Sequence, residues 1–479
     1  MSTTTPATTP ASNTSRPGIP AALEELKSLL GDRLSTAQAV REQHGTDESY
    51  HRPYPPHAVA FVQSTDEVAS VLKICHRLGC PVIPFGAGTS LEGHIAALEG
   101  GVSLDLSSMD RILDIHADDL DCRVEAGVTR KQLNRALGDH GLFFPVDPGA
   151  EATLGGMAAT GASGTDAVRY GTLRENVLGL TVVTAEGRVL KLGGRARKSS
   201  AGYDLARLMV GSEGTLGVIT ELELKVHGLP EKIAAAVCPF PSVDAAVRTA
   251  IETIQSGVPV ARMELLDEAA LDAVNRYSDR NDPVAPTLFL EFHGSPAGVE
   301  EQAQAVQELA TENGADGFHW TVDAQERDAL WHARHHAYWA CLALRPGAKG
   351  WPTDVCVPVS KLAECIRETQ KDIQRLDLLA PIVGHVGDGN FHLVFIVDPE
   401  DKDEMARAHE VDSRMVARAL DIGGTATGEH GVGYGKIPWV AREHGDAIDW
   451  MRAIKKALDP GNILNPGKIF DLEPPSSES

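Results

Sequence analysis

Short apolar segments separated by glycines and prolines run through the first half of the chain, from about residue 53 to residue 230. Alternating apolar and polar positions, bounded by turn residues, predict strands. Strands are expected at residues 58–63, 81–85, 102–106, 122–127, 177–192 and 218–226. Residues 65–79 instead have helical spacing, beginning at a capping residue and ending at Gly79.

The pattern changes near residue 232, where amphipathic helices begin to alternate with the strands. Residues 235–278 predict strand, helix, strand and helix in turn, and residues 286–314 begin a second unit of this kind. Further strands and helices are expected over residues 354–395, then a long helix over 403–424 and a terminal helix. Such alternation with short links predicts an α+β domain, with an antiparallel sheet covered by helices on one face.

The length of 479 residues allows two domains or more and a sizeable core. Residues 1–20 are rich in Thr, Ser and Pro and have no apolar core, so we expect a disordered tail and no secretory signal. We expect a first domain over residues 21–230 and a second over residues 231–425. The remaining segment, residues 426–479, is expected to complete the active site and to return to the first domain.

The net charge of −23 argues against binding of nucleic acid or an anionic membrane through a broad basic surface. The seven cysteines are scattered, with no C-x-x-C pair and no iron–sulfur run, which indicates a reducing cytoplasm. No apolar run is long enough to span a membrane. We therefore expect a cytoplasmic protein, with peripheral contact to a membrane left open.

The segment "GHVGDGNFHLVF" (residues 384–395) carries two histidines around a turn signal. Asp388 and Gly389 favour a hairpin turn, and a turn centred on them would place His385 opposite His392. Opposed side chains in an antiparallel pair have Cβ atoms about 5 Å apart. Two imidazoles at that spacing can share one metal ion, whereas the alternative is a surface hairpin that happens to carry histidines.

A second polar cluster, "GEHGVG" (residues 428–433), places Glu429 beside His430 between glycines. Adjacent residues of an extended segment point in opposite directions, so the two are expected to differ in function. The alternative is a capping turn. Residues 330–351 include basic side chains suited to binding a carboxylate, since arginine binds carboxylates with two hydrogen bonds. The basic candidates are Arg334, Arg345 and Lys349, although most basic residues in such runs face solvent.

Three segments are dense in glycine and small residues: residues 84–93, 147–172 and 211–220. The first contains G-x-G but lacks the third glycine of the dinucleotide-binding fingerprint. Glycines bring backbone amides together around an anion, and small residues let the backbone approach a flat ring. Three such segments in one domain favour a large, planar, phosphate-bearing cofactor.

In this order, the three segments resemble the flavoprotein family named after vanillyl-alcohol oxidase and p-cresol methylhydroxylase. From about residue 30 to residue 470 the chain is similar to one branch of it, the FAD-linked D-2-hydroxyacid dehydrogenases. "GASGTDAVRYGTLRENVLGL", "RPGAKGWPTDVCVPVS" and "ILNPGKIF" are most similar to the cytochrome-type D-lactate dehydrogenases. The resemblance implies a two-part FAD-binding domain followed by an antiparallel-sheet substrate (cap) domain.

The resemblance also implies which residues hold FAD. Those for the pyrophosphate are Gly86, Ala87, Gly88, Thr89 and Ser90. Those for the flavin and ribityl are Pro148, Thr153, Gly156, Ala159, Thr160, Ser163, Gly164 and Gly171, with Gly217 and Ile219 at the adenosine end or nearby and Asn465 closing over the cofactor. Thr89 stands where some relatives attach FAD to a histidine, so non-covalent FAD is expected.

For the chemistry, the resemblance makes Glu429 a third metal ligand beside His385 and His392, for Zn²⁺ or Mn²⁺. It makes His430 the general base, with Arg334 and Lys349 binding the substrate carboxylate. The expected reaction is oxidation of a D-2-hydroxyacid, D-lactate foremost, with hydride transfer to flavin N5. The D stereochemistry rests on the resemblance alone.

Several alternatives stay open at this point. The chain resembles glycolate oxidase or dehydrogenase flavin subunits and D-2-hydroxyglutarate dehydrogenases as well, and a non-catalytic flavin- or metal-binding module is a third reading. Val394, two residues past His392, is apolar and favours a short or apolar substrate side chain over a diacid. The electron acceptor can be a quinone, a cytochrome or an electron-transfer flavoprotein, and a homodimer is open.

Overall fold

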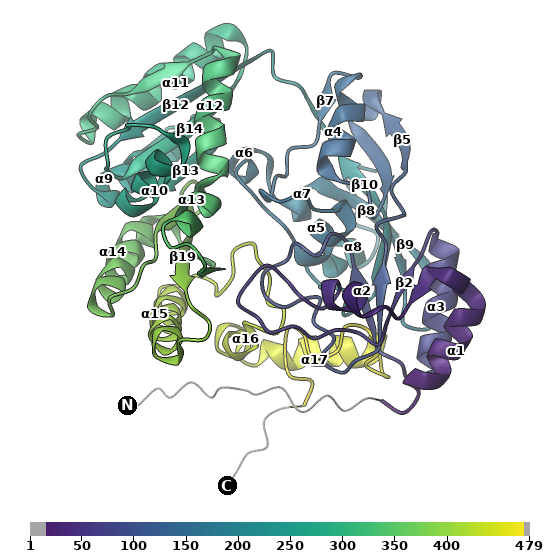
Figure 1. The fold of residues 1–479 in the computed structure, drawn as a ribbon. Coiled ribbons are helices and arrows are strands. Elements are labelled where there is room, and N and C mark those ends of the chain that lie inside the picture. Colours follow the sequence, from purple (N-terminus) through teal and green to yellow (C-terminus); the bar gives the residue numbers. More distant parts are fainter. Residues whose placement is uncertain (1–15, 474–479) are drawn as a thin grey trace.

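The computed structural model describes residues 16–473, which form two domains with the last helices beneath the first of them (Figure 1). Most of the expected N-terminal tail lies outside the described residues. Helix α1 (Ile19–Leu30) begins before residue 20, because its apolar face, including Ala22 and Leu26, is buried in the first domain. No helix between residues 16 and 473 is long and apolar enough to cross a membrane.

The first domain begins with a four-stranded sheet in the order β1-β2-β4-β3. Its strands are β1 (Leu34–Ser35), β2 (Ala58–Phe61), β3 (Val82–Phe85) and β4 (Val102–Asp105), and β2, β3 and β4 are parallel. The predicted helix is α3 (Thr65–Leu78), which connects β2 to β3. Ser64 caps it by accepting the N–H of Glu67 at 3.2 Å, and Gly79 ends it with φ +65.

A five-stranded antiparallel sheet, in the order β5-β6-β10-β8-β9, completes the first domain. Its strands are β5 (Ile112–His116), β6 (Asp121–Glu125), β8 (Val177–Val183), β9 (Val189–Gly193) and β10 (Val218–Lys225). The expected strand over residues 177–192 is therefore a hairpin of β8 and β9. Short elements link the strands: α2 (Gln38–Gln43), α4 (Arg130–Gly138), β7 (Leu142–Phe143), α5 (Leu154–Thr160), α6 (Ala167–Tyr170), α7 (Leu173–Asn176), α8 (Leu205–Met209) and β11 (His227–Gly228).

The second domain is built on one large sheet in the order β15-β12-β14-β13-β18-β19-β16, with β17 also paired to β19. All its pairs are antiparallel, which confirms the prediction. The strands are β12 (Lys232–Pro239), β13 (Val260–Leu266), β14 (Thr287–Gly294), β15 (His319–Thr321), β16 (Lys349–Pro352), β17 (Val355–Cys356), β18 (Ile382–His385) and β19 (Asn390–Val397).

Helices pack on both faces of this sheet. Four long helices share one core with the first face, as expected: α9 (Val243–Gln255), α11 (Pro296–Glu312), α14 (Val359–Arg375) and α15 (Lys402–Asp421). Part of the second face is covered in addition by α10 (Glu268–Ser278), α12 (Ala324–His335) and α13 (Ala337–Ala343). Strands buried on both faces lose simple alternation, as in β14, where Leu288 and Phe289 enter opposite cores.

After α15 the chain returns to the first domain through α16 (Ile437–His444) and α17 (Ala447–Leu458), which lie at its base in Figure 1. Ile463 and Leu464 are fully buried in the core of that domain. The returning segment runs beside β3, since Val82 N–H donates to Ile463 O at 2.8 Å and Asn465 N–H donates to Val82 O at 2.9 Å. The C-terminal segment is thus part of the first domain's structure.

A buried ion pair anchors this return. The ammonium of Lys455 lies 2.5 Å from Asp459 Oδ2 and also donates to Thr215 O and Leu464 O, at 2.8 and 2.9 Å. We predict that Asp459→Asn lowers the free energy of unfolding by about 3 kcal/mol, because it leaves a buried ammonium without its counter-ion. Urea denaturation followed by tryptophan fluorescence measures this.

The matched control is Asp449→Asn, which breaks the exposed pair of Asp449 with Arg452 on the same helix. That change is expected to cost under about 0.5 kcal/mol. Equal losses from the two substitutions would contradict the anchoring role of the buried pair.

Candidate active site

A cavity of about 630 Å³ lies where the two domains and the C-terminal segment meet. The first domain contributes the glycine-rich segments, including residues 86–90 and 147–153. The second domain contributes Arg334 from α12 and the two histidines of β18 and β19. A loop between α15 and α16 adds Glu429 and His430. The site is thus assembled from distant parts of the chain.

Most of the predicted FAD residues line this cavity: Gly86, Ala87, Gly88, Thr89, Ser90, Pro148, Thr153, Gly156, Ala159, Thr160, Ser163, Gly164 and Asn465. The backbone approaches too closely there for larger residues. A Cβ on Gly86 would lie 2.2 Å from Thr153 Oγ1, and one on Gly164 would lie 1.8 Å from Asp147 O. The volume is in the range of cofactor pockets, and the walls are backbone and small side chains, so the residues fit FAD.

Three predicted cofactor residues are closely packed and are not among the residues that line the cavity. Gly171 has φ +78 and follows α6, where a Cβ would lie 2.7 Å from Glu175 Cβ. Gly217 passes so close to β8 that a Cβ would lie 2.5 Å from Val182 Cγ1. Ile219 is buried in the core of the first domain.

The hairpin of β18 and β19 differs from the sequence prediction. His385 pairs with Asn390, so the connecting loop is residues 386–389, and the predicted direct pairing of His385 with His392 is wrong. Two contacts favour this longer loop: the side chain of Val386 is buried, and Gly389, at φ +81, lies against Val357 O. The shift is two residues, which keeps both histidines on the same face of the sheet.

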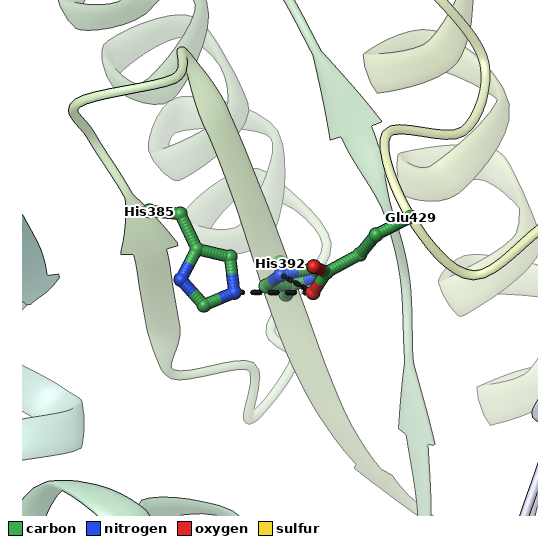
Figure 2. Close-up of side chains that lie close together, drawn as sticks. All are labelled: His385, His392 and Glu429. Atoms are coloured by element: carbon green, nitrogen blue, oxygen red, sulfur yellow. Dashed lines mark hydrogen bonds and ion pairs between the residues drawn. The ribbon is translucent and has the colours of Figure 1, made fainter. Parts of the chain in front are cut away.

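The two histidines still converge on Glu429 (Figure 2). Glu429 Oε1 lies 3.1 Å from His385 Nε2 and 3.3 Å from His392 Nε2, and potential ligand atoms of all three residues lie within 4.8 Å of one another. Burial opposes charge on Glu429, yet His385 and His392 hold its pKa far below the usual value. Two imidazoles and one carboxylate this close suit a divalent metal and leave coordination positions open.

Each histidine is oriented through its other nitrogen. His392 Nδ1 donates to Thr353 O at 2.8 Å, and His385 Nδ1 donates to Glu264 Oε1 at 2.7 Å. Both Nε2 atoms are thereby turned toward Glu429. Metal-binding histidines are commonly held in this way by a backbone carbonyl or a carboxylate.

Glu264 is a site residue that the sequence analysis missed. It is fully buried on β13 and accepts hydrogen bonds from His385 and, at 2.5 Å, from Arg334 Nη2. Burial alone would raise the pKa of Glu264, but His385 and Arg334 lower it to about 2. The sequence did contain one indication of Glu264, an acidic residue within the apolar strand "VARMELL". The neighbouring sequence does not show that His385 and Arg334 are its partners.

Of the predicted substrate cations, Arg334 lines the cavity and Lys349 does not. Nε of Arg334 is buried and has no hydrogen-bond partner within residues 16–473, so this N–H is available to a carboxylate. Lys349 is exposed. Because side chains alternate along a strand, Lys349 lies on the same side of β16 as Trp351, which packs in the core on the face of the sheet away from the cavity. Arg345 pairs with Glu404 at 2.6 Å.

His430 lies parallel to His392, with ring centroids 5.0 Å apart and an angle of 12° between the planes. Its Nδ1 is buried, 3.9 Å from Glu92 Oε1. Burial lowers the pKa of His430, but Asp354 and Glu92 reverse this, so the pKa is raised. Asp354 accepts the N–H groups of both Glu429 and His430 at 2.9 Å, so it caps this turn.

Comparison with known proteins agrees with this architecture. Residues 56–193 match the model of an FAD binding domain, and residues 229–469 match "FAD linked oxidases, C-terminal domain". The chain is 51% identical over 461 residues to a probable mitochondrial D-lactate dehydrogenase of Danio rerio, covering 95% of this chain and 93% of that protein. It is 45% identical to a mitochondrial D-lactate dehydrogenase [cytochrome] of Arabidopsis thaliana, covering 94% of this chain and 80% of that protein.

Among solved structures, p-cresol methylhydroxylase has the same fold, with a TM-score of 0.79, 16% identity, and coverage of 96% of this chain and 98% of that one. The matched models fall on the two domains described above. Together they include the glycine-rich cradle, meaning the cavity-lining segments 86–90 and 147–164, and the histidine hairpin. On these grounds, the chain belongs to the family of FAD-linked oxidases.

Proposed function

We propose that the protein is an FAD-dependent dehydrogenase that oxidises a D-2-hydroxyacid, D-lactate foremost, to the 2-oxo acid. The observation that carries the proposal is the cluster of His385, His392 and Glu429, which lies beside Arg334 in a cavity whose other wall is the flavin cradle. Relatives named D-lactate dehydrogenase, at 51% and 45% identity, support the substrate.

The cofactors supply two kinds of chemistry when bound. The glycine-rich cradle would hold FAD without a covalent bond, and FAD would supply a hydride acceptor at flavin N5. His385, His392 and Glu429 would hold a divalent metal, Zn²⁺ or Mn²⁺, which would supply a Lewis acid for the substrate hydroxyl. The chain's own residues orient the substrate and move its proton.

Arg334 is proposed to hold the substrate carboxylate. Glu264 fixes one side of its guanidinium through Nη2, while Nε remains available in the cavity. His430 is proposed as the base. Because its Nδ1 is directed toward Glu92, Nε2 is the atom left to take the hydroxyl proton.

The cavity favours a monocarboxylic acid. Among the described residues that line it, Arg334 is the one lysine or arginine, so one carboxylate can be paired. Val383 and Val394 lie two residues from His385 and His392 on the same strands and face the cavity with them. A second carboxylate on the substrate side chain would be desolvated against this apolar wall.

For the electron acceptor we propose a cytochrome, because the Arabidopsis relative carries that word in its name. A quinone or an electron-transfer flavoprotein are the alternatives. The expected cytoplasmic location and homodimer stay predictions from the sequence.

Substrate choice is tested by anaerobic flavin reduction across D- and L-2-hydroxyacids. We predict that D-lactate bleaches the flavin and that its kcat/KM exceeds that for D-2-hydroxyglutarate by at least about 30-fold, since an unpaired carboxylate costs about 2 kcal/mol or more. Glycolate and L-lactate are the comparison substrates. A preference for the diacid, or for glycolate, would overturn the assignment.

Metal dependence is tested by chelation and by His385→Ala. Losing the Lewis acid is expected to slow flavin reduction about 10³-fold while the flavin absorbance of the protein stays the same. Added Zn²⁺ or Mn²⁺ should restore the chelated wild type and leave His385→Ala slow. Unchanged reduction rates after both treatments would show that the cluster does not hold a working metal.

The orienting role of Glu264 is tested by Glu264→Gln. We expect kcat/KM to fall 10- to 100-fold, with weaker metal retention on dialysis, because His385 and Arg334 lose the charge that orients them. The control is Glu291→Gln. Glu291 is a buried glutamate on the neighbouring strand β14, and it is hydrogen-bonded to His293 and not to His385 or Arg334. Equal losses in the two variants would indicate general damage to the sheet.

A further inference from the structure

The loop that presents Glu429 and His430, residues 427–433, lies outside every helix and strand. Its backbone N–H groups therefore need acceptors other than a sheet or helix. Asp354, in the link between β16 and β17 of the second domain, accepts two of them, from Glu429 and His430. One end of this Glu429 loop is thus fastened to the domain that carries the histidines.

The other end of the Glu429 loop is fastened to the first domain by Glu213. Val432 N–H donates to Glu213 Oε1 at 2.7 Å, and Gly433 N–H donates to Oε2 at 2.8 Å. The carboxylate is almost fully buried. Gly431 lets it come this close, because a Cβ there would lie 2.8 Å from Glu213 Oε1 and 2.7 Å from His94 Nε2.

The backbone of Glu213 is bonded to the flavin cradle. Its N–H donates to Ala159 O at 2.7 Å, and its carbonyl accepts from Asn465 Nδ2 at 2.8 Å. Ala159 and Asn465 both line the cavity, as does Glu213 itself. Glu213 has φ +53, a left-handed conformation that residues other than glycine rarely adopt, so its position is set by these surrounding bonds.

We propose that Glu213 is a positioning residue that couples FAD binding to metal binding. FAD in the cradle would contact the segments that hold the Glu213 backbone, and the carboxylate would carry that constraint to the loop that turns Glu429 toward the histidines. By linkage, a metal at the histidines then tightens FAD by the same factor as FAD tightens the metal. This rests on the proposed function, because it takes FAD and a divalent metal as the two ligands.

The test compares the FAD dissociation constant of the holoenzyme in EDTA and in saturating Zn²⁺ or Mn²⁺, from flavin fluorescence recovered on dilution. We expect the metal to tighten FAD about tenfold in the wild type. In Glu213→Gln the tightening of FAD by the metal is expected to fall to about onefold. The amide can accept only one of the N–H groups of Val432 and Gly433 through its oxygen, and its NH₂ group, itself a donor, would face the other N–H. Equal tightening in the two proteins, or none in the wild type, overturns the proposal.

Glu125→Gln is the matched control, since Glu125 is a buried carboxylate of the same domain that bonds Arg111 and lies outside the cavity lining. It should keep the tenfold factor. If Glu213→Gln does not fold, Gly431→Ala displaces the same carboxylate, and tenfold tightening retained in that variant overturns the proposal. Failure of D-lactate to reduce the wild-type flavin would contradict the proposed function alone. The coupling between FAD and the metal is measured from the FAD dissociation constant, which does not depend on substrate oxidation.

Discussion

Burial of carboxylates governs how this site is built, because a buried charge needs a cation or several N–H donors. Three acidic residues meet that need in different ways. Glu264 is paired with the imidazole of His385 and the guanidinium of Arg334, whereas Asp354 and Glu213 each accept two backbone N–H groups of the Glu429 loop. Glu264 thereby orients His385 and Arg334. Asp354 fixes one end of the Glu429 loop, and Glu213 fixes the other end.

The two domains contribute different parts of the site, because the first supplies mainly backbone and small residues and the second supplies side chains from its strands. The first domain offers glycines and small residues, which suit a large planar cofactor but supply few charged groups. The second offers strands whose side chains alternate, so one face packs against four long helices while the other, which three further helices cover in part, also holds His385, His392 and Glu264. The C-terminal segment joins them, since it is paired with β3 and also carries Glu429 and His430.

Local patterns were enough to predict much of this. Glycine density located the cradle and period-two alternation located the strands, whereas the roles expected for Glu429 and His430 came from the family resemblance. Contacts between distant segments could not be predicted, because a sequence pattern reports spacing along one element only. Hence the hairpin register was wrong by two residues, Lys349 was predicted to bind the substrate although it does not line the cavity, and Glu264 was missed.

We propose that a metal ion held by His385, His392 and Glu429 binds the hydroxyacid in front of the flavin. Anomalous diffraction at the metal absorption edge, from crystals of the holoenzyme with bound D-lactate, detects such an ion. We expect one peak within coordination distance of both Nε2 atoms and the Glu429 carboxylate, with substrate oxygens completing the shell. A map without this peak, or D-lactate bound away from it, would show that no metal ion binds the substrate at this site.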